Sequence, residues 1–170
     1  MKEYLNKFAG VPDENIFLIT DDHATKTEIE ILLQDRIKKL VKEGDTEYFY
    51  YAGHGIPDVE NQTPYILPYD GNPDNPKMSG YPLERLYNDL KDLKAKNIYL
   101  FIDACFSGMV GREEKEKLLS AGSRPGTLIV KDPVIASEKI ALLAASRENQ
   151  ISNFYKEEEH GLLTYYILFS

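Results

Sequence analysis

Cysteine, histidine and tryptophan are scarce in this chain of 170 residues, which has one cysteine (Cys105), three histidines and no tryptophan. A single cysteine excludes an internal disulfide, so the sequence does not require an oxidising compartment. No run of about 18 apolar residues is present to span a membrane, and residues 1–10 lack the apolar stretch of a signal peptide. These absences predict a cytoplasmic protein with no membrane partner.

Basic residues are also in deficit, with 20 Lys and Arg against 28 Asp and Glu and a net charge of -8. Such a surface repels nucleic acid, so we expect no nucleic-acid partner. The hydrophobic share of 42 % and the charged share of 28 % are ordinary for a globular protein. The length fits one domain, which we place over residues 1–170.

Apolar patterning alternates between helix and strand along the chain. Thr25 and Glu28 predict the capped start of a helix that ends at Gly44, and residues 97–103 form a uniformly apolar run that predicts a parallel strand covered on both faces. The other elements that we expect are strands at 15–20, 47–53 and 138–145, a hairpin near 65–67, and helices at 1–9, 82–93 and from 161 to 169. This order predicts an α/β fold whose mostly parallel sheet has helices on both faces.

His54 and Cys105 each follow a predicted strand, at residues 47–53 and 97–103. Because ligand sites of α/β sheets lie beyond the carboxyl ends of the strands, we expect both side chains at one edge of the sheet. A thiol of ordinary pKa is mostly protonated at neutral pH, and a nearby imidazole favours the reactive thiolate. Gly53 and Gly55 allow a sharp turn there, and the Gly55 and Cys105 amides are candidate donors to an oxyanion.

The alternative is that Cys105 is a buried core residue, since free cysteine is among the most buried residue types. A Gly-His-Gly sequence is also weak when taken alone. The position of both residues at strand ends favours the catalytic interpretation, as does their separation of 51 residues. His23 and His160, which lie near predicted helix starts, are interpreted as polar loop or cap residues.

Two motifs carry a family resemblance: YYAGHG at 50–55 and DACFSG at 103–108. They resemble the signature blocks of the caspase-like cysteine peptidases, in particular the metacaspase and bacterial caspase-like branch. The likeness extends to NIFLITDDHATKTEIEILL at 15–33 and to HGLLTYYIL at 160–168. The resemblance implies hydrolysis of peptide or protein substrates by a dyad of Cys105 and His54, with no obligatory cofactor and no resident metal.

The resemblance also assigns a substrate pocket. In metacaspases an Asp at the position of Asp103 lines the pocket for the residue before the cut bond, and Ala52 stands where a Ser often contributes. A carboxylate in that pocket would favour Arg or Lys through charge-assisted hydrogen bonds. The alternative is that Asp103 caps the turn after its strand.

Calcium activates part of the resembling family, and the spacing of Asp70, Asn72 and Asp74 is similar to the start of a calcium loop. Asn75 and Tyr81 stand where such a loop needs Gly and Glu, so the match fails. The stretch 111–126 lies where caspase-like proteins have the loop between their two subunit regions. Its basic residues, Arg112, Lys115, Lys117 and Arg124, are candidate self-cleavage points, and a solvated charge run is the alternative.

The sequence departs from the resembling family at its ends, where we expect the first and last strands of the sheet to be missing and the chain to be a fragment of a longer protein. The oligomeric state stays open for the same reason. An inactive caspase-like fold that acts as a binding or regulatory module is therefore the alternative function.

Overall fold

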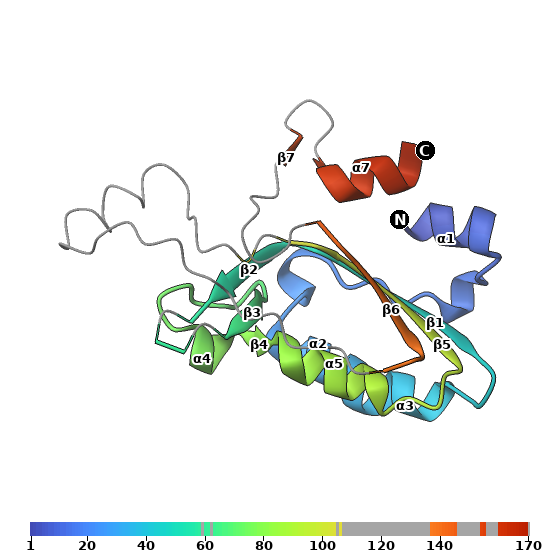
Figure 1. The fold of residues 1–170 in the computed structure, drawn as a ribbon, viewed down its shortest axis with the longest axis horizontal. Helices are drawn as coiled ribbons and strands as arrows, with labels where there is room; N and C mark the ends of the chain where they lie inside the picture. The colour runs from blue at the N-terminus through green and yellow to red at the C-terminus, as the bar shows by residue number, and fades with distance from the viewer. Residues whose placement is uncertain are drawn as a thin grey trace.

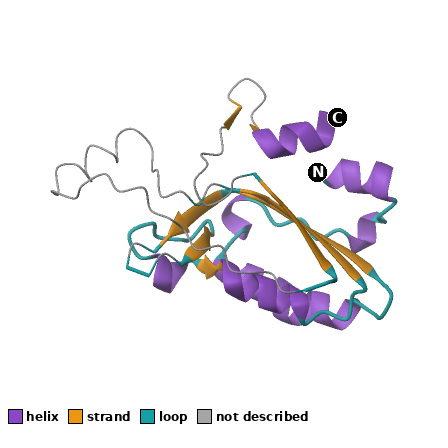
Figure 2. Ribbon diagram, viewed as in Figure 1, coloured by secondary structure: helices purple, strands orange, loops and turns teal. Residues whose placement is uncertain are grey.

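The computed structural model describes residues 1–58, 60–61, 63–104, 106, 137–145, 154–155 and 160–169. Its central feature is a parallel sheet in the order β1-β5-β6, formed by Thr46–Ala52, Asn97–Asp103 and Ile140–Ala144. In Figure 1 these strands run side by side through the middle of the molecule, and Figure 2 shows the helices above and below them. The predicted α/β fold class is confirmed, and all three strands lie where the apolar runs predicted them.

One face of this sheet is covered by two helical segments. The first runs from Lys26–Ile31 (α2) through a π-helical turn at Leu32–Arg36 (η3) to Ile37–Leu40 (α3), and the second is α5, Leu83–Lys91. Thr25 caps α2 as predicted, because its side chain accepts a hydrogen bond from the Glu28 amide at 3.2 Å. The core lies between these helices and the strands, with Leu33, Leu86, Leu90 and Leu100 almost completely buried.

The opposite face of the sheet is only partly covered. Figure 1 shows α7, Leu162–Phe169, on the side of the sheet away from α2 and α5. Tyr99 of β5 is 40 % exposed and Leu143 of β6 is 47 % exposed on that face. The prediction that residues 97–103 are covered on both faces is therefore wrong at the amino end of the strand.

A small antiparallel sheet follows β1, in the order β2-β3-β4, with bounds His54–Pro57, Pro64–Leu67 and Tyr81–Pro82. The predicted hairpin near residues 65–67 is confirmed, and its first strand begins at His54. The short helix α4, Pro76–Ser79, lies between β3 and β4 in sequence. A further pair, β7 and β8 at Phe154–Tyr155 and His160–Gly161, is antiparallel.

The amino-terminal segment differs from the prediction in one place. Helix α1, Lys2–Ala9, ends as predicted at Gly10, whose φ of 66° is the left-handed conformation that glycine adopts without strain. Residues 15–20, predicted as a buried strand, pair with no strand among the described residues, and Leu18 is 66 % exposed. Short 3-10 turns at Asp13–Asn15 (η1) and Asp21–His23 (η2) flank this extended segment. Of its apolar side chains, only Ile16 and Ile19 are partly buried. The segment therefore buries one face at most, unlike the buried strand that was predicted.

Among the helices that the structure describes, none has both the length and the apolar character needed to cross a membrane.

Candidate active site

The candidate site lies where β1 and β5 end side by side. Ala52 is the last residue of β1 and pairs with Asp103, the last residue of β5. The Gly53 amide donates to the Asp103 carbonyl at 3.3 Å and continues this contact by one residue. The chain then turns at Gly53 and enters β2 at His54. Parallel pairing therefore brings the turn before His54 and the first residue of the second motif, Asp103, to the same edge of the sheet.

His54 begins β2 and is exposed, opposite Leu67 of β3. Within the described part of the chain, no group makes a hydrogen bond or ion pair with its imidazole. Its backbone is held more closely, since the Tyr51 hydroxyl donates to the His54 carbonyl at 2.8 Å and to the Leu67 carbonyl at 3.3 Å. The imidazole is thus open to solvent while the main chain that carries it is fixed.

Gly53 makes room for this contact. A Cβ at Gly53 would lie 2.6 Å from the Tyr51 hydroxyl oxygen and 2.8 Å from the ring carbon that bears it. Any larger residue would displace the Tyr51 ring. Burial raises the pKa of Tyr51, although the hydrogen bond to the Leu67 carbonyl opposes this shift. The hydroxyl is therefore protonated, and able to donate, throughout the neutral range.

Asp103 is 6 % exposed, and its carboxylate points to the start of α7. Oδ2 accepts a hydrogen bond from the Thr164 amide at 2.9 Å and a second from the Thr164 hydroxyl. The Thr164 oxygen lies 2.7 Å from the Tyr50 hydroxyl, and because the Thr164 proton is given to Asp103, Tyr50 is the donor. Asp103 thereby caps the first turn of α7, whereas the alternative in the sequence was a cap on the turn after its own strand.

Tyr50 is half-buried and contacts Thr164 through its hydroxyl. Burial raises the pKa of Tyr50, and the Asp103 charge adds to the shift. Tyr50, Thr164 and Asp103 thus form a chain of hydrogen bonds that joins the ends of β1 and β5 to α7.

The other predicted site residues on β1 and β2 lie nearby. Ala52 is exposed at the end of β1, and Gly55 is half-buried in β2 opposite Ile66. Cys105 lies outside the described residues, as do the candidate self-cleavage points Arg112, Lys115, Lys117 and Arg124. On either side of Cys105 the structure describes Ala104 and Phe106, and both are buried.

The remaining candidates lie on segments other than β1, β2 and β5. His23 is exposed and lies 3.9 Å from the Asp22 carboxylate, and His160 is in β8. Asp70 accepts a hydrogen bond from the Lys26 amide at 2.9 Å, and the Asn72 side chain accepts one from the Asp74 amide. Within the described ranges, no three His, Cys, Asp or Glu side chains gather where they could hold a metal ion.

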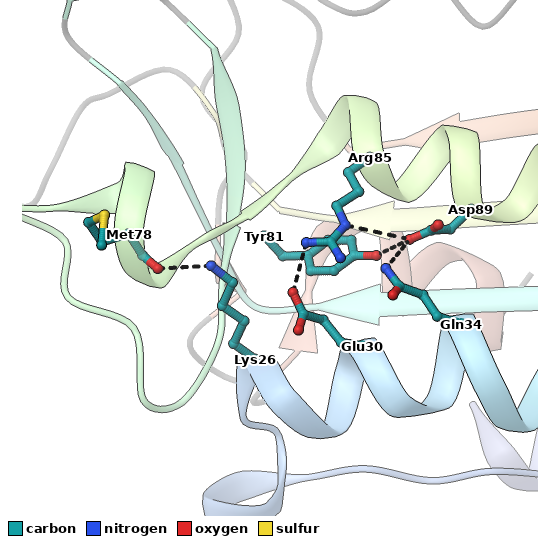
Figure 3. Close-up of polar contacts among 7 residues, drawn as sticks. All are labelled: Lys26, Glu30, Gln34, Met78, Tyr81, Arg85 and Asp89. Carbon is teal, nitrogen blue, oxygen red and sulfur yellow. Dashed lines mark hydrogen bonds and ion pairs between the residues drawn. The ribbon is translucent and has the colours of Figure 1, made fainter.

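A polar network between α5 and the helix formed by α2 and η3 supports the small sheet that carries His54 (Figure 3). The Asp89 carboxylate accepts hydrogen bonds from Tyr81 of β4 and, at 3.1 Å, from Gln34 of η3. Arg85 of α5 donates to Glu30 of α2 at 2.8 Å, and its guanidinium lies 5.3 Å from the centre of the Tyr81 ring. Tyr81 pairs with Ile66 of β3, so the network ties the small sheet to both helices.

Two lysines extend these ties to the loops. The Lys26 side chain donates to the Met78 carbonyl at 2.8 Å and fixes the start of α2 to α4 (Figure 3). Lys77 of α4 lies 3.2 Å from the Asp58 carboxylate, directly after β2. The pKa of Asp58 is lowered, first by its hydrogen bond from the Glu60 amide and then by Lys77. Both ends of β2 are therefore anchored.

Comparison with known proteins identifies the family. The chain matches the caspase domain family, peptidase C14, over residues 1–168. This protein belongs to that family. The resemblance predicted from the two motifs is confirmed.

The chain is also similar to a bacterial relative and, in its fold, to a solved structure. The chain is 27 % identical over 138 residues to a protein named as a probable protease from a Desulfuromonadales bacterium, covering 71 % of this chain and 16 % of that protein. The crystal structure of protein GSU0716 from Geobacter sulfurreducens matches the fold with a TM-score of 0.59 and 19 % identity, covering 88 % of this chain and 63 % of that one. The caspase domain therefore spans a small part of the first relative and under two thirds of the second.

Three residues of the site were missed in the sequence: Tyr50, Tyr51 and Thr164. Tyr51 makes a side-chain hydrogen bond to the His54 carbonyl and Thr164 makes one to the Asp103 carboxylate, whereas Tyr50 bonds to Thr164. The available signal was the placement of two hydroxyl-bearing residues next to the Gly-His-Gly turn. A Thr in the first turn of a predicted helix was a second signal, because its hydroxyl can bind an anion there.

Proposed function

We propose that this caspase domain is a cysteine endopeptidase that works through His54 and Cys105. The observation that carries the proposal is the register of β1 and β5, because Ala52 pairs with Asp103 and each precedes a dyad residue by two positions. The exposed imidazole of His54, free of other partners in the described part of the chain, is available to a thiol. Family membership and the relative named as a probable protease support the same chemistry.

In the proposed reaction, His54 takes the proton of the Cys105 thiol, and the thiolate attacks the carbonyl carbon of the substrate. The Gly55 and Cys105 amides donate to the oxyanion that forms. The carbon–nitrogen bond then breaks as the imidazolium gives its proton to the leaving amine, and a thioester remains. Water, deprotonated by His54, hydrolyses the thioester and restores the thiol. No cofactor takes part in this scheme.

The proposal includes cleavage after Arg or Lys, with Asp103 as the carboxylate that selects the basic side chain. It is supported by the position of Asp103 at the same edge as His54 and by the small, exposed Ala52 beside it. The hydrogen bonds from Thr164 fix the carboxylate in place. A buried carboxylate that faces a cation makes stronger hydrogen bonds than an exposed one.

The test is hydrolysis of fluorogenic peptides ending in Arg, Lys, Asp or Leu by the purified chain, with Cys105→Ala as the matched control. We expect cleavage after Arg and Lys that disappears in Cys105→Ala and falls by about 10² to 10⁴ in His54→Ala, the range typical of general acid–base catalysis. Cleavage after Asp alone would overturn the specificity. Folded protein that cleaves none of the peptides, with or without calcium, would instead support a binding or regulatory module.

Alkylation of Cys105 tests the dyad without a substrate. A thiol paired with an imidazole reacts with iodoacetamide near pH 6, and we expect this reaction to slow in His54→Ala. A buried structural cysteine would react only after unfolding, with the same rate in both proteins.

We also propose self-cleavage in the stretch 111–126, after one or more of Arg112, Lys115, Lys117 and Arg124. Incubation of the purified chain and mass spectrometry of the products would locate the cuts. Cuts that persist in Cys105→Ala would come from a contaminating protease and would refute this part.

A further inference from the structure

Tyr51 occupies an unusual position between the main sheet and the strand that carries His54. It lies on β1, one residue before the strand ends, and its ring packs against the buried core. Its hydroxyl reaches past Gly53 to the carbonyl of His54 at 2.8 Å. No motif assigns a role to this tyrosine, and its neighbour Tyr50 makes a different contact, to Thr164.

The carbonyl that Tyr51 holds belongs to the peptide unit between His54 and Gly55. Because a peptide unit is planar and trans, the direction of its C=O fixes the direction of its N–H. The N–H of this unit is the Gly55 amide, which the proposed function assigns to the oxyanion. One hydrogen bond therefore acts on both the backbone of the proposed base and the orientation of a proposed oxyanion donor.

A second contact makes the arrangement more specific. The Tyr51 hydroxyl also lies 3.3 Å from the Leu67 carbonyl, and Leu67 is the residue opposite His54 in the small sheet. The hydroxyl thus bridges the first residue pair of the β2–β3 hairpin. A Cβ at position 53 would lie 2.6 Å from the same oxygen, so Gly53 leaves the space in which the hydroxyl sits.

We propose that Tyr51 is a positioning residue, whose hydroxyl orients the His54–Gly55 peptide and, through it, the Gly55 amide. This inference rests on the proposed function for its catalytic consequence, whereas the orientation itself is a property of the folded chain. In this role Tyr51 acts on the peptide and not on the substrate.

The test compares Tyr51→Phe with Tyr48→Phe in the full chain. Tyr48 lies on the same strand, faces the other side of the sheet and stacks on Tyr99 at 5.3 Å between ring centres. We expect Tyr51→Phe to lower kcat for an Arg peptide about tenfold with KM within twofold, because misplaced catalytic groups reduce turnover. Tyr48→Phe should leave both constants within twofold of the wild type.

The orientation is measured separately by NMR on ¹⁵N-labelled protein. The Gly55 amide should change chemical shift and exchange faster with solvent in Tyr51→Phe than in Tyr48→Phe. Unchanged Gly55 signals together with unchanged kcat would overturn the inference. If the wild type cleaves no peptide, the proposed function fails, and the Gly55 signals still decide whether Tyr51 orients the peptide.

Gly53→Ala is a second variant that should disturb the same contact while leaving Tyr51 itself unchanged. The new methyl group would displace the Tyr51 hydroxyl, so Gly53→Ala should shift the Gly55 amide as Tyr51→Phe does. A Gly55 amide that is perturbed in Tyr51→Phe but keeps its wild-type signals in Gly53→Ala would contradict a role for the hydroxyl contact.

Discussion

The two faces of the main sheet are built from alternate residues of the same strands, yet they differ in composition and packing. On one face, Ile98, Leu100 and Ile102 of β5 are at most 1 % exposed and pack into the core beneath α2 and α5. On the other face, Tyr99 is 40 % exposed, while Asp103 is buried under α7. Strand alternation places successive side chains on opposite sides, so each strand contributes to both faces.

The two faces are held together by different kinds of interaction. The face toward α2 and α5 is held by apolar burial, which is not directional and grows with the area removed from water. The face toward α7 is held by hydrogen bonds among Tyr50, Thr164 and Asp103, which depend on exact atoms. Substitutions on the first face should change unfolding, and those on the second should change the site.

The largest predicted difference in stability is between Leu100→Ala and Leu143→Ala. Leu100 is fully buried on the first face, so its truncation should lower the free energy of unfolding by about 3–5 kcal/mol. Leu143 is 47 % exposed on the opposite face, so Leu143→Ala should lower the free energy of unfolding by less than about 1 kcal/mol. Urea denaturation followed by circular dichroism measures both, and equal losses would remove the distinction between the faces.

Glu47 is an ionisable residue on the core side, where strand alternation places it with Phe49. Burial, reinforced by the nearby Asp45 charge, raises the pKa of Glu47 to about 7 from an ordinary value of 4.5. Because the folded state binds this proton more tightly, stability should fall as pH rises from about 4.5 to about 7 and then level off. Glu47→Gln should therefore raise the free energy of unfolding by as much as about 3 kcal/mol at pH 8 and change it little at pH 4.

The control for Glu47→Gln is Glu43→Gln, which changes an exposed carboxylate a few residues earlier. Urea denaturation at both pH values should show a pH-dependent gain for Glu47→Gln alone. A gain of the same size at pH 4 and pH 8 would refute the assignment to Glu47 ionisation.

Thr164→Val tests the face toward α7, because it keeps the shape of the side chain and removes the hydroxyl. Tyr50 and Asp103 each lose a hydrogen bond, so we expect about 1–2 kcal/mol of lost stability. On the proposed function, KM for Arg peptides should also rise as the carboxylate loses its fixed position. Thr164→Ser retains the hydroxyl and should keep wild-type values, and a Ser variant as impaired as Val would exclude the hydroxyl as the cause.

The smallest effect is expected at Tyr99. Its ring stacks on Tyr48, while its hydroxyl makes no hydrogen bond within the described part of the chain. Tyr99→Phe should therefore change the unfolding free energy by less than about 0.5 kcal/mol. Tyr50→Phe, which removes a paired hydroxyl on the same face, should cost about 1 kcal/mol. Thermal unfolding of the two variants in parallel would show whether the loss of stability depends on the hydrogen bond or on the face of the sheet where the tyrosine lies.

Much of the fold was predictable because it follows from local periodicity. The apolar run at 97–103 became β5 with the same bounds, and Thr25 with Glu28 marked the start of α2. The segment 15–20 shows the limit of this reasoning. An apolar run predicts burial, but a strand also needs a neighbour with which its backbone can pair, and that neighbour is not encoded in the run itself.

The candidate site was predictable as far as its motifs and their shared edge. Parallel strands bring their carboxyl ends together, so His54 and Cys105 were expected at one edge, and Asp103 of the second motif lies at the edge where β1 ends before His54. The contacts that fix them were not, since Thr164 lies 61 residues after Asp103 and a hydrogen bond at that separation leaves no periodic trace. The exposed imidazole and the buried carboxylate likewise depend on packing that no short stretch of sequence determines.

The π-helical turn at Leu32–Arg36 has a consequence for how this domain compares with others of its family. A single π turn within a helix corresponds to one additional residue, accommodated without breaking the helix. Leu33 before the turn's end and Ile37 after it both remain in the core. A homologue one residue shorter at this point could therefore keep the same core with a regular α-helix, and an alignment gap there would record an insertion rather than a change of fold.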